Sequence, residues 1–226
     1  MNGLIVAIDG PSGAGKSTLA KSIAKELGFT YLDTGAMYRA LALKAIRQGL
    51  DLTDEGKVAA LARATDIDLV EKNGAVAVLL DGADVAGLIR TPEVSQMASK
   101  ISALKVVRQR LLELQRALGE RGSVVAEGRD IGTVIFPRAE VKVYLDASVE
   151  ERARRRCEEL HGAGREVTVQ DTRQEMEERD KRDSERDLAP LRKAQDALAI
   201  DSSSLSADAV RERVMIEIRK KRLANK

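Results

Sequence analysis

Short apolar runs alternate along this chain with segments that favour helices. Five runs have the length and branching of buried strands: 4–8, 29–32, 123–126, 141–145 and 197–201. Helix-forming segments lie between them, beginning with 18–27 after the first run and ending with 206–222 after the last. This alternation predicts an α/β fold in which helices flank a parallel sheet of five strands.

The pattern changes between about Thr53 and Ile89. After a helix-like stretch at 55–65, Asn73-Gly74 and Asp81-Gly82 separate short β-prone runs, and such pairs are strong hairpin signals. They predict a small three-stranded antiparallel insertion; the alternative is a surface decoration without a role. Thr91-Pro92-Glu93 then predicts the start of one long helix that runs to about Leu118.

A highly charged segment occupies residues 150–188. Its final helix-like part, 170–187, contains Met176 as its only large apolar residue, which predicts that no face of this helix is buried. The segment is either a solvated helix with many ion pairs or a mobile lid over anionic ligands. The lid offers four arginines, Arg152, Arg155, Arg156 and Arg165. Arg179, Asp183 and Arg186 are spaced to share one helical face.

Composition narrows the possible partners and sites. The net charge of +2 creates no global field for nucleic acid or anionic membranes. A single cysteine and a single histidine leave no zinc cluster, internal disulfide or His-based triad. No run is long enough to span a membrane and the N-terminus reads as a strand, so we expect a soluble cytoplasmic protein.

The strongest motif follows the first strand. Gly10-Pro11-Ser12-Gly13-Ala14-Gly15-Lys16-Ser17 is GxxxxGK[ST] between a predicted strand and a predicted helix. Glycines let successive N–H groups face one phosphate, Lys16 can reach the outer phosphates of ATP, and the Ser17 hydroxyl can bind Mg²⁺. The alternative is a glycine-rich turn with a surface lysine. The predicted ATP-binding residues here are Gly10, Pro11, Ser12, Gly13, Ala14, Gly15, Lys16, Ser17 and Thr18. Of the lid arginines, we assign Arg155 and Arg156 to ATP as well.

Two other polar segments follow predicted strands. Asp33 to Arg39 comes after the second strand and Glu127 to Asp130 after the third. Asp33 and Thr34 can serve simply as helix N-caps. The carboxyl ends of parallel strands, however, face the ligand crevice beside the phosphate loop, so Arg39 could meet a second phosphate there.

These segments carry a family resemblance over essentially the whole chain. The phosphate loop, DTGAMYR at 33–39, EGRDIGTVIFP at 127–137, ERD at 178–180, RD at 182–183 and APL at 189–191 resemble the nucleoside monophosphate kinases and, within them, the bacterial cytidylate kinases. The resemblance implies a P-loop kinase fold in a single kinase unit. Its core would comprise residues 1–52, 119–149 and 189–226. The monophosphate-binding insertion with its connecting helix would comprise residues 53–118, and the helical lid residues 150–188.

The resemblance also implies site residues and an activity. It implies ATP-dependent phosphorylation of CMP or dCMP with Mg²⁺, with CMP lying between insertion and core, and Lys16, Arg129 and Arg179 as catalytic residues. By position, the CMP-binding residues are Thr34, Tyr38, Arg39, Arg129 and Arg179 for the phosphate, Ser99, Arg108 and Asp130 for the base, and Asp183 and Arg186 for the sugar. We expect a monomer, and a role for Asp33 in holding Mg²⁺ through water stays open.

Competing functions are weighed against specific features. A GTP-hydrolysing switch lacks its guanine-specific Asn-Lys-x-Asp motif. A kinase for AMP, dTMP or shikimate would share the fold and differ in the pocket. A non-catalytic nucleotide sensor is disfavoured by Lys16 together with the lid arginines.

Overall fold

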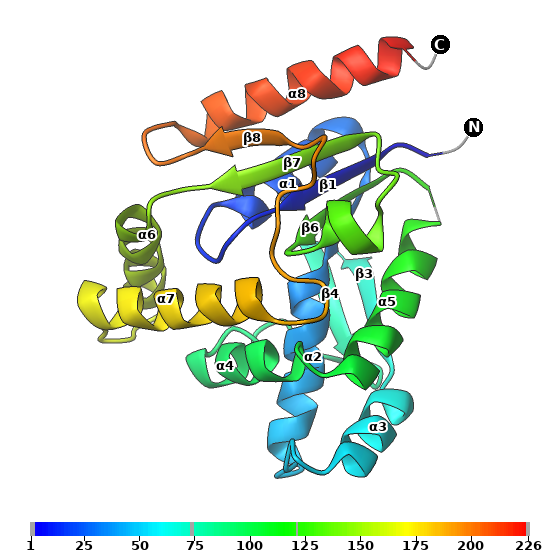
Figure 1. The fold of residues 1–226 in the computed structure, drawn as a ribbon, viewed down its shortest axis with the longest axis vertical. Coiled ribbons are helices and arrows are strands. Elements are labelled where there is room, and N and C mark those ends of the chain that lie inside the picture. The colour runs from blue at the N-terminus through cyan, green and yellow to red at the C-terminus, as the bar shows by residue number, and fades with distance from the viewer. Residues whose placement is uncertain (1–2, 73–74, 121, 225–226) are drawn as a thin grey trace. The chain divides into compact units, whose positions relative to one another are not determined.

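The computed structural model describes residues 3–72, 75–120 and 122–224 (Figure 1). The chain divides into two compact units. The first comprises Met1–Tyr31 and Arg121–Lys226, and the second is Leu32–Glu120. The second unit thus contains more than the segment 53–118, and the division into core, insertion and lid stays a prediction.

The predicted five-stranded parallel sheet is confirmed. Its strand order is β2-β6-β1-β7-β8. The strands are β1 (Ile5–Asp9), β2 (Thr30–Asp33), β6 (Val124–Gly128), β7 (Val141–Asp146) and β8 (Leu198–Asp201). The central strand β1 pairs in parallel with β6 and β7, and its Val6, Ala7 and Ile8 are fully buried. Continuous apolar runs suit strands that are covered on both faces.

In the described residues, the α-helices of the first unit are α1 (Lys16–Leu27), α6 (Val149–Gly162), α7 (Val169–Glu185) and α8 (Ala207–Ala224). The loops that leave β1 and β7 emerge at the same end of the sheet, at the left of Figure 1. The first loop enters α1 and the second enters α6, whose N-cap Ser148 accepts a hydrogen bond from the Glu151 N–H. The phosphate loop and the base of α6 are therefore neighbours.

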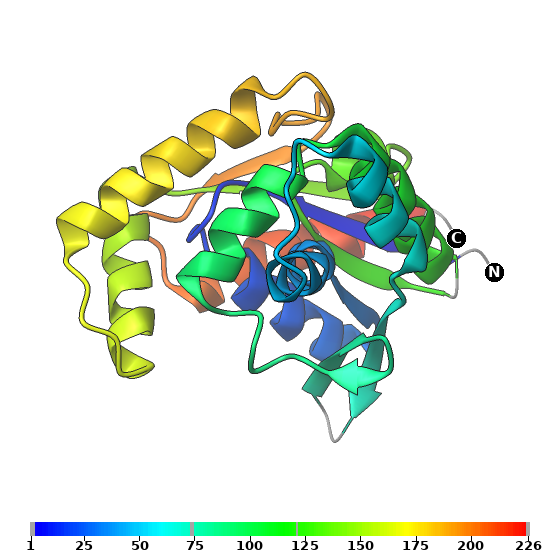
Figure 2. The ribbon, with the colours of Figure 1, turned by 90° about the horizontal axis from the view of Figure 1, so that it is seen from below.

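Helices α6 and α7 form a hairpin, seen at the left of Figure 2. The prediction that α7 has no buried face is wrong, because Thr172, Met176 and Asp183 are buried. The buried stripe is narrow and mostly polar, so a search for apolar periodicity does not detect it.

The third strand extends further than the sequence predicts. Strand β6 continues through Glu127 and Gly128, both buried, so these residues are not part of a loop. Parallel pairing of Ile8 with Glu127 and of Asp9 with Gly128 extends the strand past its apolar run. Pairing along the whole length of β1 therefore overrides the local polarity of the sequence.

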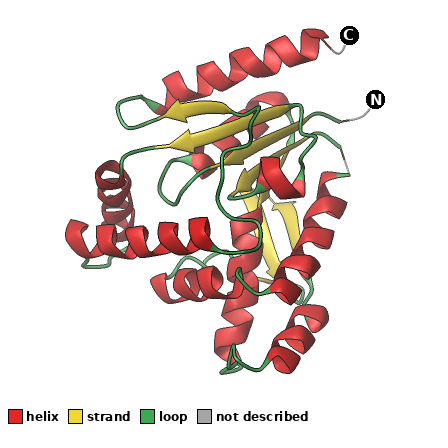
Figure 3. Ribbon diagram, viewed as in Figure 1, coloured by secondary structure: helices red, strands yellow, loops and turns green. Residues whose placement is uncertain are grey.

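The second unit contains the predicted antiparallel sheet, ordered β3-β4-β5 and drawn as yellow arrows in Figure 3. The helices and strands of the second unit are α2 (Thr34–Arg47), α3 (Glu55–Ala64), β3 (Ile67–Lys72), β4 (Ala75–Leu80), β5 (Ala83–Asp84), α4 (Pro92–Ile101) and α5 (Lys105–Gly119). The Asn73-Gly74 turn lies outside the described residues. The Asp81-Gly82 turn is confirmed, with φ values of 50° and 82° that suit a hairpin turn.

The long helix predicted from Pro92 to Leu118 is wrong, since two helices occupy this segment. The start is as expected, with Thr91 accepting a hydrogen bond from the Val94 N–H. The break follows Ile101, where the Leu104 N–H turns back to the Ile101 carbonyl at 3.1 Å. The Ser102 carbonyl accepts a hydrogen bond from the buried Arg108 guanidinium at 3.2 Å instead of continuing the helical ladder. A side chain six residues away thus replaces a backbone donor.

Candidate active site

The phosphate loop joins β1 to α1 and leaves backbone donors open. Gly15 is the N-cap of α1 with φ 92°, and no side chain caps this helix. The first N–H groups of a helix have no partner within it, so they can bind an anion. Gly10, with φ 149°, has no room for a side chain, because a Cβ there would overlap the Leu145 carbonyl of β7.

Lys16 is buried in the first turn of α1, and its Nζ donates to the Pro11 carbonyl at 2.5 Å. Burial, together with the positive charges of Arg129 and Arg179, lowers the pKa of Lys16 to about 7, although the negative charges of Glu127 and Asp9 oppose this shift. The side chain thus lies among cations, an arrangement that a bound polyphosphate would relieve.

Asp9 ends β1 and is a site residue that the sequence reasoning missed. Its carboxylate accepts hydrogen bonds from the N–H groups of Ile131 and Gly132 at 2.7 and 2.8 Å. Burial raises the pKa of Asp9 to about 6, although these two bonds oppose the shift. Asp9 therefore anchors the segment that follows Arg129 and Asp130 to the base of the phosphate loop. Its position directly before Gly10 was the available signal.

Asp183 of α7 organises a cluster of predicted substrate residues. The Nε of Arg129 lies 2.8 Å from Asp183 Oδ2, and Arg179 and Arg186 lie 3.9 and 4.0 Å from the same carboxylate. Burial disfavours the charged form, but the three arginines hold the pKa of Asp183 below its usual value. Arg186 also lies 3.6 Å from Asp130. Three guanidinium groups and the carboxylates of Asp130 and Asp183 thus form one ion-pair network, and the negative charges of Asp180 and Glu127 also act on Arg129.

A cavity of about 530 Å³ borders the phosphate loop. Its lining residues come from the phosphate loop, α1, β7, α6, the loop between β8 and α8, and α8, and include Gly15, Thr18, Arg155 and Ser202. Arg155 is held by Glu151 at 2.8 Å and by the Ser202 carbonyl at 2.7 Å. A cavity of this size can hold a nucleoside.

The two lid arginines assigned to ATP differ in their surroundings. Arg155 lines this cavity, whereas Arg156 pairs with Glu159 at 2.7 Å and does not line it. Among the two, the geometry supports an ATP contact for Arg155 alone.

The second unit holds the remaining predicted residues. Arg108 of α5 is buried and lies 5.9 Å from the centroid of the Tyr38 ring. Buried Ser99 of α4 accepts a hydrogen bond on its carbonyl from the Ser102 hydroxyl, and Ser102 in turn accepts from Arg108. Tyr38, Ser99 and Arg108 therefore form one connected group.

Thr34 and Arg39 lie at the start of α2 in the same unit. Thr34 is buried, and Asp33 caps α2 by accepting a hydrogen bond from the Ala36 N–H. Arg39 pairs with Asp33 at 3.0 Å, and its buried Nε has no hydrogen-bond partner among the described residues. Because Asp33 already serves the helix end and Arg39, its carboxylate is largely occupied.

The donor set for Mg²⁺ is small. Within the described ranges, no group of three or more His, Cys, Asp or Glu side chains could hold a metal. Ser17, half-buried in the first turn of α1, offers one hydroxyl. Mg²⁺ is often bound by few protein ligands together with substrate phosphates and water, so this set fits an ion that arrives with ATP.

Comparisons with known proteins show which family this chain resembles. A family model described as cytidylate kinase matches residues 6–220. Cytidylate kinase of Citrifermentans bemidjiense is 51% identical over 223 residues, which cover 99% of this chain and 95% of that protein. Cytidylate kinase of Bacillus subtilis is 47% identical, with 96% and 97% covered.

Solved structures add a likeness of fold. The crystal structure of an uncharacterized protein from Eubacterium ventriosum matches with a TM-score of 0.54 at 14% identity, covering 96% of this chain and 98% of that one.

Within the described residues, no helix is long and apolar enough to cross a membrane.

Proposed function

The chain belongs to the cytidylate kinase family, and we propose that it transfers the γ-phosphoryl group of ATP to CMP or dCMP, giving CDP or dCDP and ADP. One observation carries the proposal. The buried Lys16 of the phosphate loop lies within the electrostatic reach of Arg129 and Arg179, which belong to the Asp183 cluster. A donor phosphate at Lys16 and an acceptor phosphate at the arginines would balance these charges.

The chemistry needs little acid–base help. A phosphate oxygen of the acceptor is already ionised near pH 7, so a general base would contribute little. Positioning and charge neutralisation must provide most of the rate. Lys16 would neutralise charge on the transferring group, while Arg129, Arg179 and Arg39 would hold the acceptor phosphate in line.

ATP would enter as its magnesium complex. The backbone donors of the phosphate loop would bind the phosphates and Ser17 would contribute its hydroxyl to the ion. The nucleoside of ATP suits the cavity that Arg155 lines. A closed α6–α7 hairpin would exclude water, which otherwise competes with CMP for the phosphoryl group.

Recognition of cytosine would rest on donor and acceptor patterns. Arg108 can only donate, so it suits the N3 and O2 acceptors of cytosine and opposes the N3–H of uracil. Ionised Asp130 can only accept, so it suits the cytosine amino group, and Ser99 can serve either way. Asp183 and Arg186 would serve the sugar. The monomeric state and the cytoplasmic location stay predictions from the sequence.

A coupled ADP-release assay tests the function. Phosphoryl transfer from MgATP should be fastest with CMP and dCMP in a panel that also contains UMP, AMP, dTMP and shikimate. A higher kcat/KM for any of the other acceptors would overturn the proposal. ADP release without an acceptor measures hydrolysis and serves as the baseline.

A further inference from the structure

One buried arginine joins the phosphate loop to the α6–α7 hairpin. Arg152, 7% exposed, lies in the first turns of α6. Its Nε donates to the Ala147 carbonyl at 2.9 Å, and its Nη1 donates to the Ser12 carbonyl at 3.2 Å. The same Nη1 lies 2.6 Å from Asp180 Oδ2 on α7. A single guanidinium thus holds the end of β7, the phosphate loop and α7.

The phosphate loop also packs directly against this hairpin. A Cβ at Gly13 would lie 2.7 Å from the Met176 methyl carbon and 3.1 Å from Arg152 Cβ. Gly13 therefore allows close contact between the loop and both helices. Met176 is also one of the few buried side chains of α7. The docked position of α7 depends on the shape of the loop.

Asp180 lies on the part of α7 that carries the acceptor cluster. It follows Arg179 directly and precedes Asp183 by three residues, a spacing that places both carboxylates on one face of the helix. The Oδ1 of Asp180 is buried without a hydrogen-bond partner in the described part of the chain, while its Oδ2 is held by Arg152. The position of α7 relative to Arg129 is thereby tied to Arg152.

We propose that Arg152 is a positioning residue that couples occupancy of the phosphate loop to the acceptor-binding face of α7. The two states are an α6–α7 hairpin docked on the loop and an undocked hairpin. A bound polyphosphate fixes the loop, including the Ser12 carbonyl and the Gly13 surface on which the hairpin docks. Docking brings Arg179 and Asp183 of α7 to Arg129, which directly follows β6. ATP therefore raises the affinity for the acceptor nucleotide, and the acceptor raises the affinity for ATP by the same factor.

This inference rests on the proposed function, because it names CMP as the acceptor. The test measures the dissociation constant of CMP with and without a saturating, non-hydrolysable Mg-ATP analogue. In the parent protein the analogue should tighten CMP binding about tenfold or more, within the usual range of coupling between sites. In Arg152→Lys, which keeps the charge but cannot reach three acceptors at once, the factor should fall below about twofold. Asp180→Asn should reduce it similarly.

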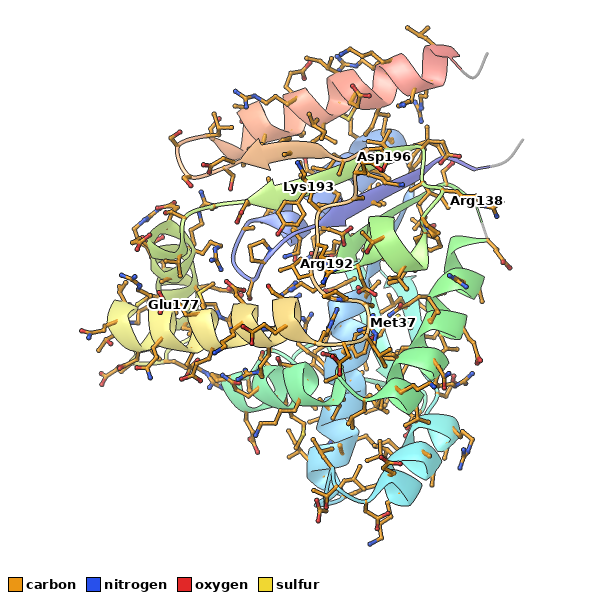
Figure 4. All side chains as sticks on the ribbon, viewed as in Figure 1. Met37, Arg138, Glu177, Arg192, Lys193 and Asp196 are labelled. Atoms are coloured by element: carbon orange, nitrogen blue, oxygen red, sulfur yellow. The ribbon has the colours of Figure 1, made fainter. Side chains whose placement is uncertain are left out.

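A matched control separates coupling from general stability. Arg173 of α7 also bridges the two helices, through Glu150 of α6 at 3.3 Å, and it pairs with Glu177, which Figure 4 labels on α7. Neither of these two ion pairs involves the phosphate loop, so Arg173→Lys should keep the parent coupling factor. A purely structural role for Arg152 would lower the melting temperature and leave the coupling factor unchanged.

The outcomes are distinct. Parent-like coupling in both Arg152→Lys and Asp180→Asn overturns the inference, as does a parent protein without coupling. If Arg152→Lys fails to fold, Asp180→Asn decides. Failure of the parent to bind or phosphorylate CMP is a failure of the proposed function. In that case, amide hydrogen exchange of residues 169–185 with the ATP analogue alone tests whether occupancy of the phosphate loop affects α7. Exchange should slow in the parent and in Arg173→Lys but not in Arg152→Lys.

Discussion

At the scale of single residues, Lys16 has the most unusual environment in the phosphate loop. Its ammonium group is buried, has a carbonyl partner in Pro11, and lies in the field of two arginines. A buried cation of this kind interacts most strongly with a phosphate group on which negative charge develops beside it in the transition state. We therefore expect Lys16 to act on the transferring phosphoryl group more than on the resting substrate.

Replacing this side chain should slow the chemistry without unfolding the protein. Lys16→Met should lower kcat by at least about two orders of magnitude, because the methionine keeps the packing and removes the charge. Steady-state kinetics measures the effect, and circular dichroism checks the fold. Lys25→Met, an exposed change on the same helix, is the matched control. A kcat within tenfold of the parent would remove Lys16 from the mechanism.

The lowered pKa of Lys16 predicts proton uptake on ATP binding. In the free protein its pKa is about 7, compared with an ordinary 10.5, so near pH 8 the side chain is mostly neutral. The phosphates of ATP favour the charged form and raise this pKa, so binding at pH 8 should take up close to one proton. Calorimetric titration in buffers of different ionisation enthalpy measures the uptake. It should vanish in Lys16→Met, and unchanged uptake in that variant would assign it to another group.

The same pKa shift determines how the stability of the ligand-free protein changes with pH. Between pH 7 and 10.5 the unfolded chain binds more protons at Lys16 than the folded protein does. This residue therefore lowers the free energy of unfolding at neutral pH, and its cost diminishes as the pH rises through that window.

At the scale of elements, the α6–α7 hairpin is held mainly by polar contacts. Its helices carry exposed ion pairs such as Arg154 with Glu158 and Arg173 with Glu177, which contribute little stability. Met176 provides the main apolar contact of α7. An element with so little apolar burial opens at small free-energy cost.

Ligands should therefore change the exchange behaviour of this hairpin. Amide hydrogen exchange across residues 150–188 should slow when ATP and CMP analogues bind together, because the closed hairpin protects its backbone. Mass spectrometry of peptides from this segment measures the change, and peptides of α8 are the internal reference. Unchanged exchange across 150–188 would leave a solvated helical hairpin without a lid function.

At the scale of the whole molecule, the residues proposed for the base are divided between the two compact units. Ser99 and Arg108 belong to the second unit, and Asp130 belongs to the first. In the proposal, the donor Arg108 and the acceptor Asp130 therefore come from different parts of the chain.

Replacing cytosine by uracil in the acceptor should therefore lower kcat/KM strongly. We expect CMP to exceed UMP in kcat/KM by on the order of a hundredfold or more, since uracil would leave both charged groups badly paired. Arg108→Met or Asp130→Ala should reduce this preference more through loss of CMP activity than through gain of UMP activity. Arg116→Met, an exposed change on α5, is the control. Values for CMP and UMP within about threefold of each other in the parent would refute this base assignment.

Local patterns in the sequence were sufficient for much of the molecule. The phosphate loop, the parallel sheet, the antiparallel insertion and the caps at Asp33, Thr91 and Ser148 follow from residues close together in the chain. Strand periodicity, glycine turns and helix caps act over a few residues, so one sequence reveals them. The pairing of Arg179 with Asp183 also follows from helical spacing. The prediction that Arg186 shares this helical face is wrong, because α7 ends at Glu185 and Arg186 approaches Asp183 from an extended residue.

Contacts between distant residues decided the rest. The break between α4 and α5 depends on buried Arg108, and the length of β6 depends on its pairing with β1. Asp9 reaches the N–H groups that follow Asp130, and Arg152 reaches Ser12 across 140 positions of the chain. Such contacts leave no periodic trace, because each depends on where the fold brings two unrelated segments together. Only the tertiary structure could therefore distinguish Arg152 from the other arginines of the same helix.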